Sequence, residues 1–314
     1  MRGLIVRGVG GFYYVRPERA PGEAGGGYGE GVYMCRARGI FKKDGLVPTV
    51  GDVVYFEATE GAEGVVNGIR PRKNLFARPP IANVDCFVAV ASAARPAPNL
   101  EIMDRFLTVA EMARAEVIIC VNKADLSDSD PEGAGGAALI ARVYGGIYPV
   151  LETSCVDGRG LERLPGLLMG KTSALAGASG VGKSTLLNAL QRGLALETGE
   201  VSARTSRGRH TTRHVELFEM DFGGMVFDTP GFSSFEAALA SPGAGGAEAA
   251  SGLAACYPEM LGYAGKCRFD DCRHIREPGC AVLDAVRDGA IAPSRYESYA
   301  RQHLELMKPR HRTR

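Results

Sequence analysis

A glycine-rich segment near the middle of the chain restricts the possible folds more than any other feature. Residues 177–184 read GASGVGKS, between an apolar run and a stretch with helical spacing. In that context the pattern is typical of a phosphate loop, which joins a buried strand to a helix. We expect the loop N–H groups, the Lys183 ammonium and the Ser184 hydroxyl to hold nucleotide phosphates and Mg²⁺. The predicted contact residues are Gly177, Ala178, Ser179, Gly180, Val181, Gly182, Lys183, Ser184 and Thr185.

Short apolar runs alternate with helical patterns on both sides of this loop. The predicted strands are residues 84–91, 117–121, 147–151, 173–176, 214–220 and 225–227, and the predicted helices are 100–115, 137–144 and 184–191. Buried strands that alternate with helices indicate a parallel sheet with helices on both faces. We therefore predict a doubly wound α/β domain over residues 77–237 of a multidomain α/β chain.

The two flanking regions have different patterns. Residues 1–76 are rich in Gly, Val, Tyr and Phe, with short alternating runs that predict a small all-β barrel or sandwich. Residues 238–314 begin with a Gly/Ala-rich stretch that fits either a helix or a linker, and end in helical patterns. A length of 314 residues is enough for three such domains.

Two short motifs that follow predicted strands, NKAD and TSC, have the residues to bind the nucleotide base. In NKAD, residues 122–125, the Asp125 carboxylate can accept hydrogen bonds from N1–H and the amino group of guanine, whereas adenine has no N1 donor. Asn122 can contact the base edge and tether neighbouring loops, and the Lys123 stem can lie over the ring. In TSC the backbone of Thr153, Ser154 and Cys155 can support the guanine O6. Each motif alone also fits a helix cap, but together they indicate a guanine nucleotide.

The last predicted strand runs into DTPG, residues 228–231. Asp228 is expected to hold Mg²⁺ through water, and the Gly231 N–H to reach the γ-phosphate. The preceding segment, residues 202–213, carries four arginines and no acidic residue. Thr211 or Thr212 is expected to complete the Mg²⁺ shell with Ser184, and Thr212 is taken as the ligand. These motifs are those of a Ras-like GTPase in rotated order, and a sheet survives such circular permutation because its strand neighbours do not change.

Four potential metal ligands lie close together near the C-terminus. Cys267, Cys272, His274 and Cys280 supply three thiolates and one imidazole, the ligand set of a closed structural zinc site. The alternative is a set of unrelated buried thiols beside a surface histidine. The other cysteines are expected to be reduced, because a cytosolic chain of this length needs no disulfides.

The charge and hydropathy of the chain limit which nucleic-acid and membrane partners are expected. The chain has 37 basic and 36 acidic residues, a net charge of +1, which argues against a uniformly basic nucleic-acid binder. Both ends are more basic than the middle, which favours an RNA partner there. Apolar stretches fall short of the roughly 20 residues that span a bilayer, so we expect a cytoplasmic protein without a membrane partner.

The permuted motif order resembles that of the circularly permuted ribosome small-subunit-dependent GTPase A (RsgA) family. The segments NLEIMDRFLTVAE (99–111) and FDDCRHIREPGCAV add to this resemblance, which covers nearly the whole chain. It implies an N-terminal OB-fold-like β-barrel over 1–76, a permuted P-loop GTPase domain over 77–237 and a zinc-binding helical domain over 238–314. It also implies a protein that binds GTP or GDP, Mg²⁺ and one Zn²⁺. Separately from the resemblance, we expect a monomer. Its expected partner is the small ribosomal subunit with its rRNA, which it helps to mature and which stimulates GTP hydrolysis.

The position after DTPG bears on catalysis. Ras-like enzymes use a glutamine there to orient water, but this chain has Phe232. The free protein is therefore expected to hydrolyse GTP slowly. His210 resembles the family histidine proposed to orient water, with Lys183 offsetting transition-state charge. Two alternatives remain open at this point: a guanine-nucleotide sensor with negligible turnover, and an RNA-dependent ATPase.

Overall fold

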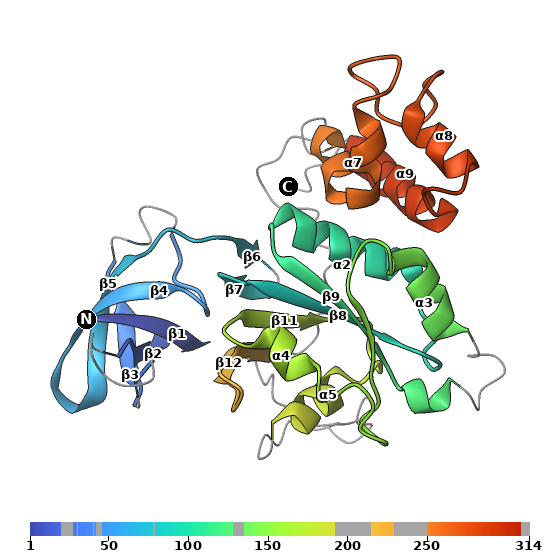
Figure 1. The fold of residues 1–314 in the computed structure, drawn as a ribbon. Helices are drawn as coiled ribbons and strands as arrows, with labels where there is room; N and C mark the ends of the chain where they lie inside the picture. Colours follow the sequence, from blue (N-terminus) through green and yellow to red (C-terminus); the bar gives the residue numbers. More distant parts are fainter. Residues whose placement is uncertain are drawn as a thin grey trace, which may run out of the picture.

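The computed structural model describes residues 1–19, 28–29, 31–39, 41, 46–77, 79–127, 135–191, 215–228 and 250–308. Figure 1 shows three parts: an N-terminal barrel in blue, a central sheet flanked by helices, and a C-terminal helical unit in orange and red. No helix in these ranges is both long and apolar enough to cross a membrane.

The N-terminal part is a five-stranded barrel. Its strands are β1 (Arg2–Val9), β2 (Phe12–Pro17), β3 (Tyr33–Ala37), β4 (Val53–Ala58) and β5 (Glu63–Ile69). They follow the order β1-β2-β3-β5-β4, and β4 closes on β1, with β3 and β5 parallel. Ile5, Val15, Val54 and Val66 are completely buried inside it. The expected OB-like barrel is confirmed.

The central part is a six-stranded sheet in the order β10-β9-β8-β11-β13-β12. Its strands are β8 (Cys86–Ser92), β9 (Glu116–Asn122), β10 (Val150–Glu152), β11 (Thr172–Ala176), β12 (Glu216–Glu219) and β13 (Met225–Asp228). All neighbours are parallel except β12, which runs antiparallel to β13. The short hairpin of β6 (Leu75–Ala77) and β7 (Pro80–Ala82) connects the barrel to this sheet.

Helices cover both faces of the central sheet, so the doubly wound arrangement is confirmed. Along β8, Phe87 and Ala89 pack with buried residues of α2 (Leu100–Met112) and α3 (Gly136–Tyr144). Val88 and Val90 point the other way, with residues of α4 (Leu164–Leu168) and α5 (Lys183–Leu190). This alternation with period two is why the strand is apolar throughout.

The helix that contains the NLEIMDRF segment is slightly shorter than its apolar pattern predicts. It begins where the Asn99 side chain accepts a hydrogen bond from the Ile102 N–H at 3.0 Å, a standard N-cap. It ends at Met112 because Arg114 adopts a left-handed conformation with φ +52°. The predicted end at residue 115 is therefore wrong by three residues.

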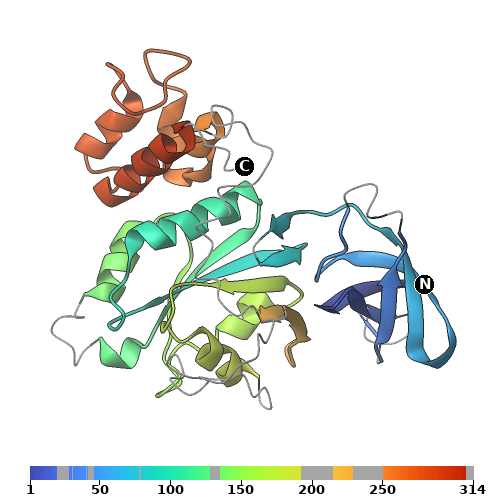
Figure 2. The same cartoon turned by 180° about the vertical axis from the view of Figure 1, so that it is seen from behind.

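The C-terminal unit is built from α7 (Pro258–Ala264), α8 (Ala281–Arg287) and α9 (Pro293–Met307), after a short 3-10 turn, η4 (Leu253–Cys256). Proline occupies the first position of α7 and of α9, where the missing N–H costs nothing. Tyr257, Met260, Val282 and Tyr299 form the centre of its apolar core. The unit packs over α2, as both views show (Figure 1, Figure 2).

Candidate nucleotide and metal sites

The predicted nucleotide motifs meet at one edge of the central sheet. The phosphate loop follows β11, NKAD begins at the last residue of β9, and TSC follows β10. Asp228 is the last residue of β13. Because these four strands are parallel, their carboxyl ends lie at the same edge. Ligands of open α/β sheets bind at this edge.

Two glycines of the phosphate loop leave no room for a side chain. Gly177 has φ +154°, and a Cβ there would lie 2.2 Å from the Val90 carbonyl oxygen. Gly182 has φ +95°, and a Cβ there would lie 2.4 Å from Nδ2 of Asn122. Glycine therefore allows the loop to approach both β8 and the NKAD segment.

Lys183 lies across the loop that it terminates. Its Nζ donates hydrogen bonds to the carbonyl oxygens of Gly177 at 2.8 Å and Ala178 at 2.9 Å. Burial lowers the pKa of this ammonium. Gly182 caps α5 without a side-chain acceptor, so the first N–H groups of this helix, next to Ser184, are left for an anion. Thr185 is exposed beside them.

Asn122 connects the three loops directly. Its side chain is 1% exposed, and Nδ2 donates to the Val181 carbonyl oxygen at 3.0 Å. Its Oδ1 accepts a hydrogen bond from the Thr153 hydroxyl at 3.2 Å. The Sγ of Cys155 lies 3.9 Å from the same oxygen. These are the contacts that the expected tethering role of Asn122 requires.

Lys123 and Asp125 are fixed by neighbouring loops. Lys123 adopts a left-handed conformation, and its Nζ donates to the Gly180 carbonyl oxygen at 2.6 Å and the Arg95 carbonyl oxygen at 2.7 Å. Asp125 accepts a hydrogen bond from the Ser154 hydroxyl at 2.7 Å. From the TSC motif we expect only the backbone of Ser154 to take part. The hydrogen bond from its side chain to Asp125 could not be predicted, because it depends on how the two loops pack.

Asp228 is half-buried at the end of β13. Burial raises the pKa of its carboxyl, and the carboxylate of Glu216 on the neighbouring strand raises it further. Glu216 gave no sequence signal, because it belongs to none of the motifs. His210, Thr211, Thr212 and Gly231 lie outside the described residues.

The C-terminal cysteines and histidine form a compact ligand cluster. The candidate ligand atoms of Cys267, Cys272, His274 and Cys280 all lie within 4.8 Å of one another. The Nδ1 of His274 is 3.5 Å from the Cys267 Sγ and 3.4 Å from the Cys280 Sγ. Three thiolates and one imidazole at this separation fit a tetrahedral zinc ion, which supplies rigidity and no chemistry when all four ligands belong to the protein.

A carboxylate shapes the loop that carries these ligands. Glu277 accepts backbone N–H hydrogen bonds from Arg273 at 3.0 Å, Ile275 at 2.8 Å and Arg276 at 3.0 Å. Burial opposes ionisation, but these hydrogen bonds prevail and lower the pKa of Glu277 to about 2. The loop turns at His274, which has φ +60°. Glu277 is a further residue that sequence reasoning missed.

The comparisons with known proteins agree with this geometry. A model of the RsgA GTPase domain matches residues 69–238, and a model of the RsgA N-terminal domain matches residues 2–66. The chain belongs to the RsgA family. A curated relative from Geobacillus sp. (strain WCH70), named small ribosomal subunit biogenesis GTPase RsgA, is 42% identical over 98% of this chain and 99% of its own length.

A second RsgA relative and two solved structures extend the match. The relative from Caldanaerobacter subterraneus subsp. tengcongensis, which has the same name, is 40% identical over 95% of this chain and 93% of its own length. The crystal structure of YjeQ from Thermotoga maritima superimposes with a TM-score of 0.78, at 35% identity over 98% of this chain and 99% of that chain. YloQ, described as a circularly permuted GTPase, gives a TM-score of 0.75 at 36% identity, covering 99% and 96%. The resemblance seen in the motifs is confirmed.

Proposed function

We propose that this protein hydrolyses GTP to GDP and phosphate during late maturation of the small ribosomal subunit. The observation that carries the proposal is the convergence of the phosphate, NKAD and TSC loops through the Asn122 side chain. The names of the RsgA relatives supply the small-subunit context. An ATPase is disfavoured because the loop that presents Asp125 has the chemistry of a guanine reader.

In this proposal different residues of the chain contact the base and the phosphates of the nucleotide. Asp125, held by the Ser154 hydroxyl, accepts the N1–H and amino hydrogen bonds of guanine. The Lys123 stem covers the ring, and the TSC backbone faces O6. Binding of phosphate would draw the Lys183 ammonium from the carbonyls of Gly177 and Ala178 onto the phosphate oxygens.

Ser184 and Asp228 offer hard oxygen donors suited to Mg²⁺ at the same edge of the sheet. The ion, when bound with GTP, offsets the negative charge of the phosphates. Thr212 is our choice for a further ligand, and the Gly231 N–H for a contact to the γ-phosphate. Both stay predictions from the sequence.

Catalysis needs a group that orients water, because Phe232 cannot do so. We assign that role to His210. Replacing it in His210→Ala is expected to lower the small-subunit-stimulated turnover by about a hundredfold, within the usual range for a general acid–base group, with little loss of GTP affinity. The comparison is His303→Ala, a histidine of α9 far from the nucleotide loops in the chain. An unchanged stimulated rate for His210→Ala would remove this residue from the mechanism.

The other parts of the molecule are proposed to engage the subunit. We divide the chain into a barrel over 1–76, the GTPase domain over 77–237 and a zinc domain over 238–314, with the barrel and zinc domain contacting rRNA. GTP favours docking, and hydrolysis favours release. A guanine-nucleotide sensor would instead show no stimulation of multiple-turnover hydrolysis by purified small subunits.

Base recognition tests the proposal most directly. In Asp125→Asn the amide presents one donor and one acceptor, which match the carbonyl and N1–H of xanthine better than guanine. The nucleotide preference should therefore move from GTP to xanthosine triphosphate by about a hundredfold, measured by competition against a fluorescent nucleotide. The matched control is Asp157→Asn, an exposed carboxylate near the same loop, which should keep the GTP preference. An unchanged preference in Asp125→Asn would refute guanine recognition by this residue.

A further inference from the structure

A row of four side chains crosses from the barrel to the nucleotide edge. In the sheet registers Tyr14 of β2 is opposite Arg7 of β1, Arg7 is opposite Glu216 of β12, and Glu216 is opposite Asp228 of β13. Directly opposed residues of antiparallel strands place their side chains on the same face. Neighbouring strands are about 4.8 Å apart, so Arg7 and Asp228 are separated by about 10 Å with Glu216 between them.

Arg7 has two possible partners in this row. Its guanidinium carbon lies 4.0 Å from the centroid of the Tyr14 ring, in a cation–π contact. Within the described part of the chain, no ion pair shorter than 4.0 Å joins Arg7 to Glu216. The guanidinium therefore rests on the barrel side while an acceptor lies opposite on the GTPase side.

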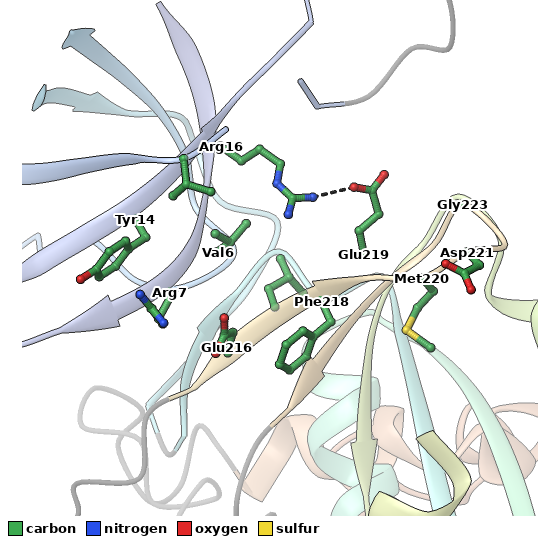
Figure 3. Close-up of a pocket in the computed structure, with 12 residues that line it drawn as sticks. Val6, Arg7, Tyr14, Arg16, Glu216, Phe218, Glu219, Met220, Asp221 and Gly223 are labelled. Atoms are coloured by element: carbon green, nitrogen blue, oxygen red, sulfur yellow. Dashed lines mark hydrogen bonds and ion pairs between the residues drawn. The ribbon is translucent and has the colours of Figure 1, made fainter. Parts of the chain in front are cut away.

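The space between the two partners is open. A cavity of about 830 Å³ lies beside the β1–β12 pairing, and Arg7, Tyr14, Glu216 and Phe218 line it. Figure 3 shows Arg7 and Tyr14 on the barrel strands, with Glu216 and Phe218 on the facing hairpin. The Arg7 side chain thus has room to turn from the ring towards the carboxylate.

The charges of these four side chains determine how a cation bound at Asp228 affects Arg7. Glu216 and Asp228 are directly opposed carboxylates on neighbouring strands, and like charges at this separation repel each other. A cation at either end relieves this repulsion. Two cations at opposite ends repel each other and share the same carboxylates, so each weakens the hold of the other.

We propose that Arg7 and Glu216 are positioning residues that couple the cation at Asp228 to the contact between the barrel and β12. Glu216 attracts Arg7 across the cavity and so helps to hold the barrel against β12. Mg²⁺ with nucleotide at Asp228 weakens that attraction. By linkage, the barrel contact lowers the affinity for Mg²⁺ by the same factor. This inference rests on the proposed role of Asp228 in the GTP site.

Mg²⁺ affinity of the GDP-bound full-length protein, measured by calorimetry, tests the coupling. Arg7→Gln should bind Mg²⁺ about two- to tenfold more tightly, and Glu216→Gln more weakly by a similar factor, as expected for unit charges at these separations. Adding Arg7→Gln to Glu216→Gln should raise the affinity by a smaller factor than Arg7→Gln does alone, because only the direct repulsion between Arg7 and Mg²⁺ is then relieved. Arg7→Lys should keep the affinity of the unmodified protein.

The matched control is Arg16→Gln. Arg16 also joins the barrel to the hairpin, through an ion pair with Glu219 at 2.5 Å, but that pair does not lead to Asp228. Arg16→Gln should leave Mg²⁺ affinity unchanged. An equal gain in Arg16→Gln and Arg7→Gln would mean that loosening the barrel is enough, and would overturn the proposal.

A second measurement reports the cavity itself. The chain contains no tryptophan, so Phe218→Trp introduces a single emission probe between the barrel and β12. Mg²⁺ with GDP should shift the tryptophan emission of the Phe218→Trp protein. It should leave the emission unchanged in the protein that carries both Phe218→Trp and Arg7→Gln. If fluorescent GDP binds but Arg7→Gln alters neither the shift nor the Mg²⁺ affinity, this inference alone fails. If no guanine nucleotide binds, the proposed function fails with it.

Discussion

Single atoms determine whether the nucleotide loops can touch. The glycine at position 182 has φ +95° and faces Nδ2 of Asn122, the atom that donates to the Val181 carbonyl oxygen. Any side chain at this position must displace that amide. The contact that unites the loops therefore depends on the absence of one carbon atom.

Gly182→Ala is accordingly expected to lower GTP affinity at least tenfold, because the added methyl group would lie 2.4 Å from Asn122 Nδ2. Gly170→Ala is the matched control, since Gly170 also has positive φ, but a methyl group added there would meet no atom within 4 Å. Gly170→Ala should cost about 1 kcal/mol of stability and leave GTP affinity intact. Equal affinity losses in both variants would show that backbone strain, and not the clash with Asn122, matters.

Lys183 provides the second test at this scale. Its ammonium is partly desolvated and donates hydrogen bonds to two loop carbonyl oxygens. When a nucleotide binds, the ammonium can donate to the phosphate oxygens instead. Lys183→Ala should abolish measurable binding of fluorescent GTP and GDP while the zinc content stays at one ion per chain. Tight GTP binding by this variant would contradict the assignment of the phosphate loop.

At the scale of elements, the loop that carries the candidate zinc ligands is shaped by a residue that is not one of them. Glu277 gathers three backbone N–H groups of the loop that carries His274. Groups that orient ligands in this way commonly change metal affinity by about 10- to 100-fold when they are removed. The loop thus depends on one carboxylate for its shape before any metal binds.

We therefore expect Glu277→Gln to weaken zinc binding by about tenfold or more, measured by competition with a chromogenic chelator. The amide loses the charge that strengthens the three hydrogen bonds. Glu297→Gln, at a position of α9 outside this loop, should leave zinc affinity unchanged. Removal of zinc by a strong chelator should unfold the C-terminal unit of the unmodified protein, seen as loss of helical circular dichroism.

Continuous apolar runs predicted the central strands of the sheet, but several shorter elements and loop contacts were not predicted. The strands β8, β9 and β11 are apolar because both of their faces are covered, and the motifs at their ends announced the site. The short helices α4 and α7 were not predicted. Five residues are too few to show a helical period in α4, and α7 follows the Gly/Ala-rich stretch whose pattern is ambiguous. The hydrogen bond from the Ser154 side chain to Asp125 and the role of Glu277 were not predicted, because both depend on loop packing, which no local sequence pattern records. The antiparallel direction of β12 also has no signature in its own residues.

At the scale of the whole molecule, the C-terminal unit is fastened to the GTPase domain by buried charges. Arg295 of α9 is completely buried and donates to Asp104 of α2 at 2.6 Å and to Glu259 of α7 at 2.7 Å. Its guanidinium also lies 4.5 Å from the ring of Tyr257. These contacts tie three helices together, so α2 and the C-terminal unit are expected to move as one.

Arg295→Ala would leave two carboxylates without their cation and is expected to cost about 3–5 kcal/mol of stability. Arg287→Ala is the control, because that arginine pairs with Asp284 at the surface, where such pairs contribute less than about 1 kcal/mol. Urea unfolding followed by circular dichroism gives both values. A loss below about 1 kcal/mol for Arg295→Ala, the level of a surface pair, would show that the buried pairs do not stabilise the unit.

The pairing of β1 with β12 joins the beginning of the chain to a segment that follows about 200 residues later. Domains generally fold in the order in which they leave the ribosome, so the barrel is complete long before β12 is synthesised. Until then, the backbone of β1 around Arg7 lacks its partner β12, and an unpaired strand edge is a template for wrong pairing. Before β12 is synthesised, the free edge of β1 must therefore be kept from pairing with other strands. A chain that stops before residue 216 lacks this pairing partner.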